Sequence, residues 1–68
     1  MKDLAKKFGE NLRRIRKSKR ISQDKLALSA DIDRSYIGRI ERGEVNITLE
    51  KAYQIANVLD CDIRDLLP

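Results

Sequence analysis

The segment from Asp33 to Gly43 limits what this chain can fold into more than any other part of the sequence. Asp33 suits the N-cap of a helix, because its carboxylate can accept hydrogen bonds from the first free backbone amides. Gly43 suits the left-handed residue at which helices often end. Between them, Ile37 and Ile40 lie three apart and share one side. The segment 33–42 is therefore predicted to be an amphipathic helix with its apolar side turned inward.

The other side of this helix is polar and basic. Its residues recur at helical spacing: Arg34, Ser35, Gly38, Arg39 and Arg42. Such a face is what a helix needs to enter the major groove of DNA, where arginine bonds guanine and phosphates line the rim. The charged face of an isolated amphipathic helix more often meets only solvent, so the rest of the chain must decide between the two interpretations.

Helical periodicity extends over the 68 residues, and no strand-like alternation is present. A chain of this length forms one domain, residues 1–68, near the lower limit for an independent core. Because only three residues are aromatic, the core must be aliphatic. The fold class is therefore predicted to be all-α with five helices. Besides 33–42, helices are expected at about 3–18, from 22 to a connection at 29–32, at 49–59 and at 63–67.

The connection at 29–32 is short and polar, which predicts that the helices on either side of it form a helix-turn-helix. Asp31 is expected in the left-handed conformation that such a joint needs, because Asp adopts it more readily than most residues. Ile32 is then expected to enter the core. Further buried positions follow the helical stripes: Leu4, Phe8, Leu12, Ile15, Leu26, Ala27, Ala30, Leu49, Ala52, Ile55, Ala56 and Leu59.

Glu41 lies one turn after Ile37, so its carboxylate turns toward the core. A buried carboxylate must be paired or hydrogen-bonded. Arg16 lies at the edge of the apolar stripe of the first helix, and we predict a buried ion pair between Arg16 and Glu41. The alternative is an exposed Glu41 that pairs with a nearby Lys or Arg. Gly9, inside the first helix, is expected at a point of close packing.

Charge is distributed unevenly along the chain. Residues 1–20 hold nine Lys and Arg against two acidic residues, whereas residues 44–68 hold two basic against five acidic residues. The basic part indicates a polyanionic partner, and the acidic end indicates a different surface. A membrane surface is a weaker candidate, because the first helix lacks the large apolar residues of an interfacial anchor. No signal peptide or membrane-spanning segment is recognisable, so a cytoplasmic location is expected.

Four pieces of sequence carry a resemblance to a known family. They are Ser22-Gln-Asp-Lys-Leu-Ala27, Tyr36-Ile-Gly-Arg-Ile-Glu-Arg-Gly43, the helix from Leu49 to Leu59, and Asp62-Ile-Arg-Asp-Leu-Leu67. The chain resembles the Cro/repressor-type (XRE-like) helix-turn-helix family of DNA-binding transcriptional regulators over nearly its whole length. The segment 34–49 also looks like the controller proteins of restriction–modification systems. The resemblance implies a compact five-helix repressor-like DNA-binding domain, with the helix-turn-helix formed by the second and third helices.

The resemblance also implies roles for individual residues. The base-reading positions of the recognition helix 33–42 are Arg34, Ser35 and Arg39. The positions for DNA and phosphate contacts are Gln23, Arg42 and Asn46. Independently of the resemblance, some of the basic residues Arg13, Arg14 and Lys17 of the first helix are expected to bind or neutralise phosphates. The alternative role of these basic residues of the first helix is only to keep the protein soluble. Two positions depart from the family pattern, since position 31 is often Gly and position 33 is often neutral, whereas both are Asp here.

A domain of this size achieves specific binding best as a symmetric dimer on two half-sites about one DNA turn, ~34 Å, apart. We therefore expect double-stranded DNA as the partner, and a homodimer whose interface lies at the acidic end. Candidate interface residues are Tyr53, Val58, Leu66 and Leu67. The alternative function is an antitoxin-like or adaptor module whose acidic end binds another protein and which binds DNA only secondarily.

An enzyme is the least favoured class. The chain has no His, and its single cysteine, Cys61, lacks neighbours that would activate a thiolate, so it is expected as a small core residue in a reducing cytosol. Asp60, Asp62 and Asp65 are better explained by the ends of two helices than by a metal site. No catalytic residue, metal, cofactor or small-molecule ligand is therefore expected.

Overall fold

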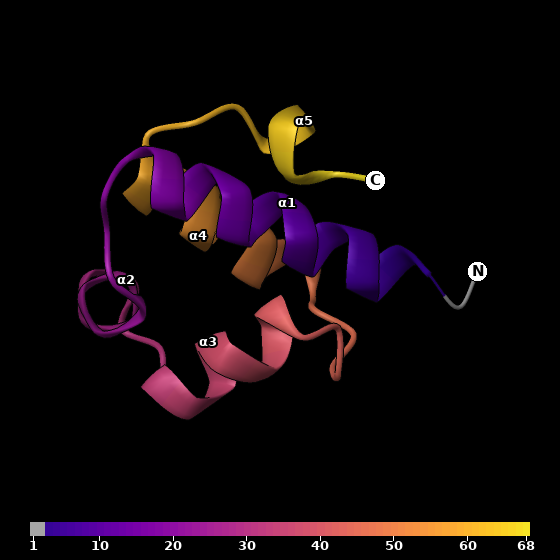
Figure 1. Cartoon of the computed structure of the whole chain (residues 1–68), viewed down its shortest axis with the longest axis horizontal. Helices are drawn as coiled ribbons and strands as arrows, with labels where there is room; N and C mark the ends of the chain where they lie inside the picture. Colours follow the sequence, from indigo (N-terminus) through magenta and orange to yellow (C-terminus); the bar gives the residue numbers. More distant parts are fainter. Residues whose placement is uncertain (1–2) are drawn as a thin grey trace.

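Five α-helices make up the fold of residues 3–68, the part of the chain that the computed structural model describes (Figure 1). They are α1 (Leu4–Ser18), α2 (Gln23–Ala30), α3 (Arg34–Glu41), α4 (Leu49–Leu59) and α5 (Ile63–Leu66). The predicted all-α class is confirmed, but α2 continues to Ala30 and α5 ends one residue early, at Leu66. Lys2, one of the nine basic residues of the segment 1–20, lies outside the described range. No helix within that range is long and apolar enough to cross a membrane.

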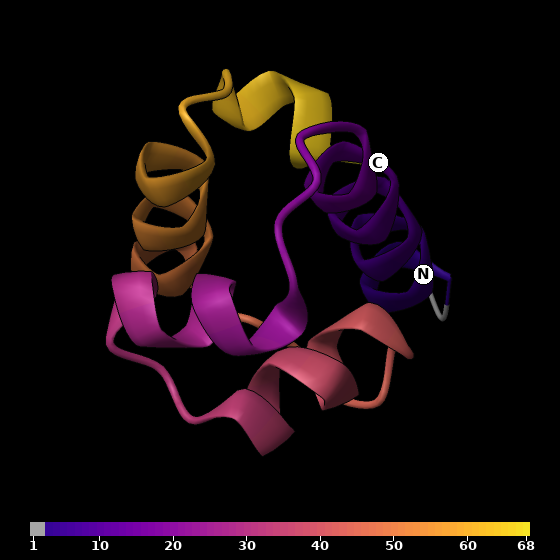
Figure 2. The same ribbon diagram turned by 60° about the vertical axis from the view of Figure 1, so that its left-hand side comes forward.

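The arrangement of the helices leaves one side of α3 at the surface. α1 packs against both α3 and α5, α2 packs against α3 and α4, and α4 packs against α5. Figure 2 shows α2 and α3 lying one above the other at an angle, joined by a short turn at the edge of the molecule. The inner side of α3 therefore rests on α1 and α2, and its outer side faces away from the bundle.

Polar caps set the first turns of α2 and α3 where the sequence predicts them. Ser22 Oγ accepts a hydrogen bond from the amide of Lys25 at 3.0 Å, and Asp33 Oδ1 accepts one from the amide of Ser35 at 3.1 Å. Two further predicted caps are confirmed, namely Thr48 on α4 and Asp62 on α5. Capping thus occupies one oxygen of the Asp33 carboxylate, which stands at the start of α3.

Four of the described helices end in the same backbone motif. Its left-handed residues are Asp31 and Gly43, as predicted, and Arg20 and Asp60, which the sequence did not indicate. After α2, the amide of Asp31 donates to the carbonyl of Leu28, and the amide of Ile32 donates to that of Ala27 at 2.9 Å. This pair of bonds is the Schellman pattern, which turns the residue after the left-handed one back toward the helix. It carries Ile32 into the core, as predicted.

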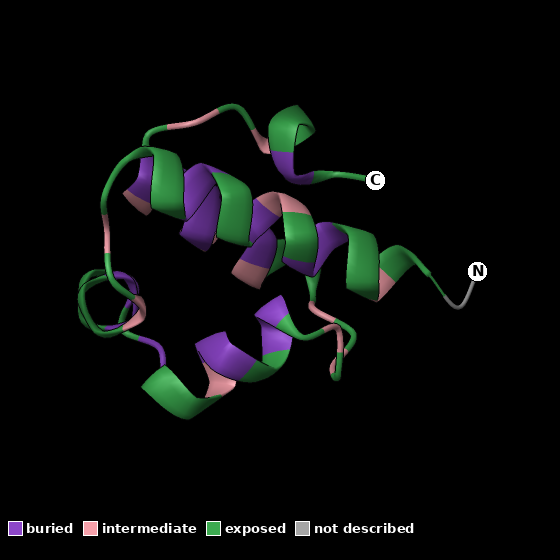
Figure 3. Ribbon diagram, viewed as in Figure 1, coloured by how far each residue is buried: buried purple, intermediate pink, exposed green. Residues whose placement is uncertain are grey.

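The core lies between the helices (Figure 3) and is aliphatic, as expected, apart from Phe8. Its fully buried large side chains are Leu12, Leu26, Ile37, Ile40, Ile55, Leu59 and Leu66. Two predictions of burial are wrong: Leu4 is 45% exposed and Leu49 is 73% exposed. Each is the first residue of its helix, so the stripe it belongs to begins before the neighbouring helices cover it.

The C-terminal part differs from the prediction in two side chains. Leu66 is completely buried, so its assignment to a dimer interface is wrong. The end of α5 is also joined to α1, since the side chain of Asn11 donates to the carbonyls of Leu66 and Leu67. Cys61 packs against the core but is only partly buried. Desolvation raises the pKa of its thiol, with the carboxylate of Asp65 acting in the same direction.

Candidate nucleic-acid interface

Two glycines let α3 lie directly against α1. A Cβ atom on Gly9 would overlap the carbonyl oxygens of Ile40 and Glu41 at the end of α3. A Cβ atom on Gly43 would come within 2.7 Å of the Cα atom of Lys6, and Gly43 is left-handed as well, with a φ of +73°. The close packing predicted at Gly9 is confirmed, and it fixes how near α3 sits to α1.

A buried ion pair fixes the orientation of α3 on α1. Arg16 Nε lies 2.6 Å from Glu41 Oε2, and Arg16 Nη2 donates to Oε1 at 3.1 Å. The two side chains are 9% and 3% exposed. Arg16 Nη1 also donates to the carbonyl of Ile21 at 2.7 Å. The predicted pair is therefore confirmed, and its two parallel bonds give it a defined direction.

Gln23 belongs to the same network, which the sequence did not predict. Its amide Nε2 donates to Glu41 Oε1 at 2.9 Å. Because a carboxylate can only accept, the amide nitrogen must face Glu41, and its second hydrogen remains for another acceptor. Gln23 is thus held half-buried in the first turn of α2, with its amide fixed against the end of α3.

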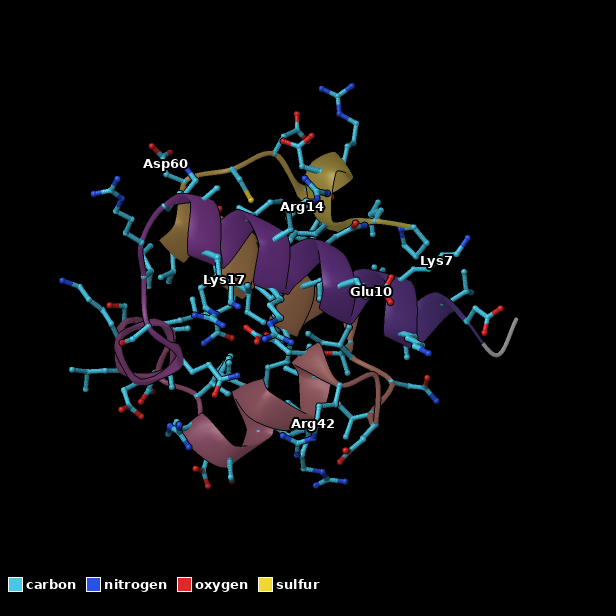
Figure 4. All side chains as sticks on the ribbon, viewed as in Figure 1. Lys7, Glu10, Arg14, Lys17, Arg42 and Asp60 are labelled. Atoms are coloured by element: carbon cyan, nitrogen blue, oxygen red, sulfur yellow. The ribbon has the colours of Figure 1, made fainter. Side chains whose placement is uncertain are left out.

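The outer side of α3 gathers the polar residues that the sequence indicated. Its four exposed members, called the α3 surface below, are Arg34, Ser35, Arg39 and Arg42. Figure 4 shows Arg42 on the side of α3 that faces away from α1. Gly38 lies among them but is covered rather than open, since a Cβ there would stand 3.2 Å from Arg42 Nη1. Ile37 and Ile40 occupy the opposite, buried side, as predicted.

Two acidic side chains contact the α3 surface, which sequence reasoning missed. Arg34 Nε lies 2.5 Å from Asp24 Oδ1 on α2, although both side chains are largely exposed. Glu44, just after α3, accepts from Arg42 Nε at 2.6 Å and lies 3.9 Å from Arg39 Nε. The hydrogen bond from Arg42 lowers the pKa of the Glu44 carboxyl and raises the pKa of the guanidinium. The position of Glu44 two residues after Arg42 was the one feature of the sequence that could have indicated this contact.

Basic residues of α1 flank the α3 surface unevenly. Lys17 lies one turn after Arg13, on a stripe next to Arg16, whose side chain turns to α3. Arg14 points elsewhere, because it lines a hollow formed with residues 60–65. Figure 4 shows Arg14 close to α5 and Lys17 on the body of α1. Arg13 and Lys17 are therefore the members of this group placed toward α3.

A second surface, called the apolar groove below, lies where α1 begins, α4 begins and the chain ends. It has a volume of about 270 Å³ and is lined mainly by Leu4, Phe8, Ile47, Leu49, Ala52 and Leu67. Asn46 is exposed and lines this groove too, so the structure places it beside apolar side chains. Lys51, which the sequence left without a role, lies with Ser35 and Arg39 around another hollow.

Comparison with known proteins adds a family and several relatives. The helix-turn-helix family model HTH_3 matches residues 12–66. The control protein C.BamHI of Bacillus amyloliquefaciens is 44% identical over 61 residues, covering 88% of this chain and 75% of that protein. The control protein C.SmaI of Serratia marcescens is 35% identical over 65 residues, covering 96% and 77%. The crystal structure of the restriction-modification controller protein C.AhdI from Aeromonas hydrophila matches with a TM-score of 0.89 and 41% identity, covering 93% of this chain and 96% of that one.

Proposed function

This chain belongs to the helix-turn-helix family HTH_3 and is a DNA-binding transcriptional regulator, and from that premise we propose that it is a control protein of a restriction–modification system. The similarity to C.BamHI, C.SmaI and C.AhdI supports this role, since their names describe it. The proposed target is double-stranded DNA that carries a two-fold-symmetric operator, and the protein binds this operator as a homodimer.

Sequence recognition is proposed to occur through α3 in the major groove. The observation that carries this step is the division of α3 into a side buried in the core and an exposed side with three arginines and a hydroxyl at or near its ends. Arg34 and Arg39 would each donate to a guanine, a contact worth about 1–3 kcal/mol of discrimination. Ser35 lies between them and would contact a neighbouring base edge. The close packing at Gly9 and the buried pair of Arg16 and Glu41 hold α3 in one orientation on α1, which supports a defined position of α3 in the groove.

Phosphate contacts are proposed to come from the elements around α3. The residues assigned to them are Gln23, Arg42, Asn46, Arg13 and Lys17. Gln23 suits this role because one amide hydrogen is held by Glu41 while the other remains for a phosphate oxygen. Each phosphate neutralised by a basic side chain should steepen the logarithmic salt dependence of binding by about 0.9.

The apolar groove supports the proposed dimer. Three leucines that line it stay exposed, Leu4, Leu49 and Leu67, and so does Tyr53, one turn after Leu49 on α4; their exposed fractions lie between 42% and 73%. Clustered exposed apolar residues are typical of a surface that another protein covers. Of the interface residues expected from sequence, Tyr53 and Leu67 meet this condition, whereas Val58 packs against the core. A second copy on this surface would leave both α3 surfaces open to DNA.

Selection from a random duplex library, followed by sequencing of the bound fraction, tests the proposal. The wild type and Arg34→Ala should be compared, with Arg64→Ala, an exposed arginine on α5, as the matched control. We expect a two-fold-symmetric motif for the wild type and the control, and one relaxed position per half-site for Arg34→Ala. If no motif is enriched above a salt-sensitive background, sequence-specific binding is rejected and a protein partner is favoured instead.

A further inference from the structure

Carboxylates on a surface that meets DNA oppose the charge of the phosphates, so Asp24 and Glu44 call for an explanation. Their ion pairs with Arg34 and Arg42 are exposed, and exposed pairs contribute little to folding because water screens them. Asp24 also lies in the first turn of α2, where a negative charge favours the helix dipole. That local role does not require an arginine of α3 at 2.5 Å.

The geometry of the Asp24 contact leaves Arg34 able to bind a base. The carboxylate lies against Nε, at the side of the guanidinium. Within the described residues, no hydrogen bond occupies the terminal nitrogens Nη1 and Nη2 of Arg34. Arginine can use these nitrogens for a bidentate contact with O6 and N7 of guanine. Arg34 could therefore keep its contact with Asp24 while it donates to a guanine.

The backbone fixes Glu44 at the end of α3. Gly43 is left-handed, and the amide of Glu44 donates to the carbonyl of Arg39 at 2.9 Å. At the ends of α1, α2 and α4, the residue in this position is Ile21, Ile32 or Cys61, and each packs against the core. At the end of α3 the same position holds an exposed carboxylate that contacts two arginines. The motif thus carries Glu44 to the α3 surface.

We propose that Asp24 and Glu44 are specificity-determining residues of this regulator, an inference that rests on the proposed function. Each carboxylate lies beside an arginine assigned to base reading, Asp24 beside Arg34 and Glu44 beside Arg39, and repels phosphate from that guanidinium. Arg42 holds Glu44 in this position through its Nε and Nη2. A guanine edge carries no net charge, so the carboxylate repels its acceptor atoms O6 and N7 much less than it repels a phosphate. Arginine therefore gains more from the correct base than from a phosphate, and binding to random DNA is weakened more than binding to the operator.

The test compares the affinity for the duplex selected above with that for a random-sequence duplex of equal length, by fluorescence anisotropy over a range of salt. Asp24→Asn and Glu44→Gln should each tighten random-duplex binding about threefold and steepen its salt dependence by up to about 0.9. Affinity for the selected duplex should stay constant or fall, so the ratio of the two affinities falls. Asp24→Glu, which keeps the charge, should retain most of the wild-type ratio.

Asp65→Asn is the matched control, because it makes the same charge change on α5, across α1 from α3 (Figure 1). Circular dichroism checks that every variant is folded. If Asp65→Asn and Asp24→Asn tighten binding to the random duplex equally, the effect comes only from net charge and the inference is overturned. Unchanged random-duplex binding in Asp24→Asn and Glu44→Gln would overturn it as well. If the wild type prefers no duplex, the proposed function fails, and the random-duplex comparison of Asp24→Asn with Asp65→Asn still decides whether the carboxylate opposes phosphate.

Discussion

Replacing Glu41 by glutamine tests how strongly the buried pair holds the fold. Glu41 accepts three side-chain hydrogen bonds, two from Arg16 and one from Gln23. A glutamine has one accepting oxygen, and its amide hydrogens would face a donor of Arg16. Arg16 would then keep a buried charge without a full partner, which costs about 3–5 kcal/mol when one member of such a pair is removed.

This loss is large for the whole protein, since a chain of 68 residues has a folding stability of roughly 3–10 kcal/mol. Urea unfolding followed by far-UV circular dichroism measures it. Glu50→Gln, at an exposed site in the first turn of α4, is the control and should change the unfolding free energy by less than about 0.5 kcal/mol. Arg16→Met combined with Glu41→Leu should recover most of the stability. A loss below about 1 kcal/mol in Glu41→Gln would refute the reasoning.

Four further outcomes follow from the packing. Gly9→Ala should lower stability by about 2 kcal/mol in thermal unfolding, because overlap with α3 outweighs the helix propensity of Ala; a stabilised variant would contradict this. Asp31→Gly should raise stability by about 0.5–1 kcal/mol in urea, since Gly relieves a φ of 56°, and a loss would contradict that. In sedimentation, Leu49→Asp should shift the protein to monomer, whereas Leu28→Asp, at an 84% exposed leucine on α2, should not. The Cys61 thiol should react more slowly with iodoacetamide when folded than in urea, because burial raises its pKa; equal rates would exclude this protection.

The sequence was sufficient for those features that depend on neighbours along the chain. Spacing of three and four residues placed Ile37 and Glu41 on the inner side of α3, and with Arg16 it predicted the buried pair. Cap residues predicted where α2 and α3 begin. Exposure at the helix ends could not be predicted, since periodicity gives the face of a residue and not how far the next helix extends. The predicted burial of Leu49 was wrong for that reason.

Contacts between side chains of different helices were also beyond the sequence. Asp24 and Arg34 meet because α2 and α3 cross at a particular angle (Figure 2), which no spacing rule provides. Gln23 reaches Glu41 for the same reason, 18 residues away. The base-contact assignments of Arg34 and Arg39 drew on the family resemblance, and the structure adds that both are exposed on one surface.

Backbone amide chemical shifts, recorded by NMR while the duplex selected from the library is added, test the central claim most directly. The claim is that α3 and the start of α2 form the DNA-binding surface. We predict the largest shift changes in residues 22–24 and 33–46, with small changes in α5, Ile63–Leu66. Changes concentrated in α4 and α5, with the residues of α3 unaffected, would contradict the claim and move the DNA contact to the other end of the molecule.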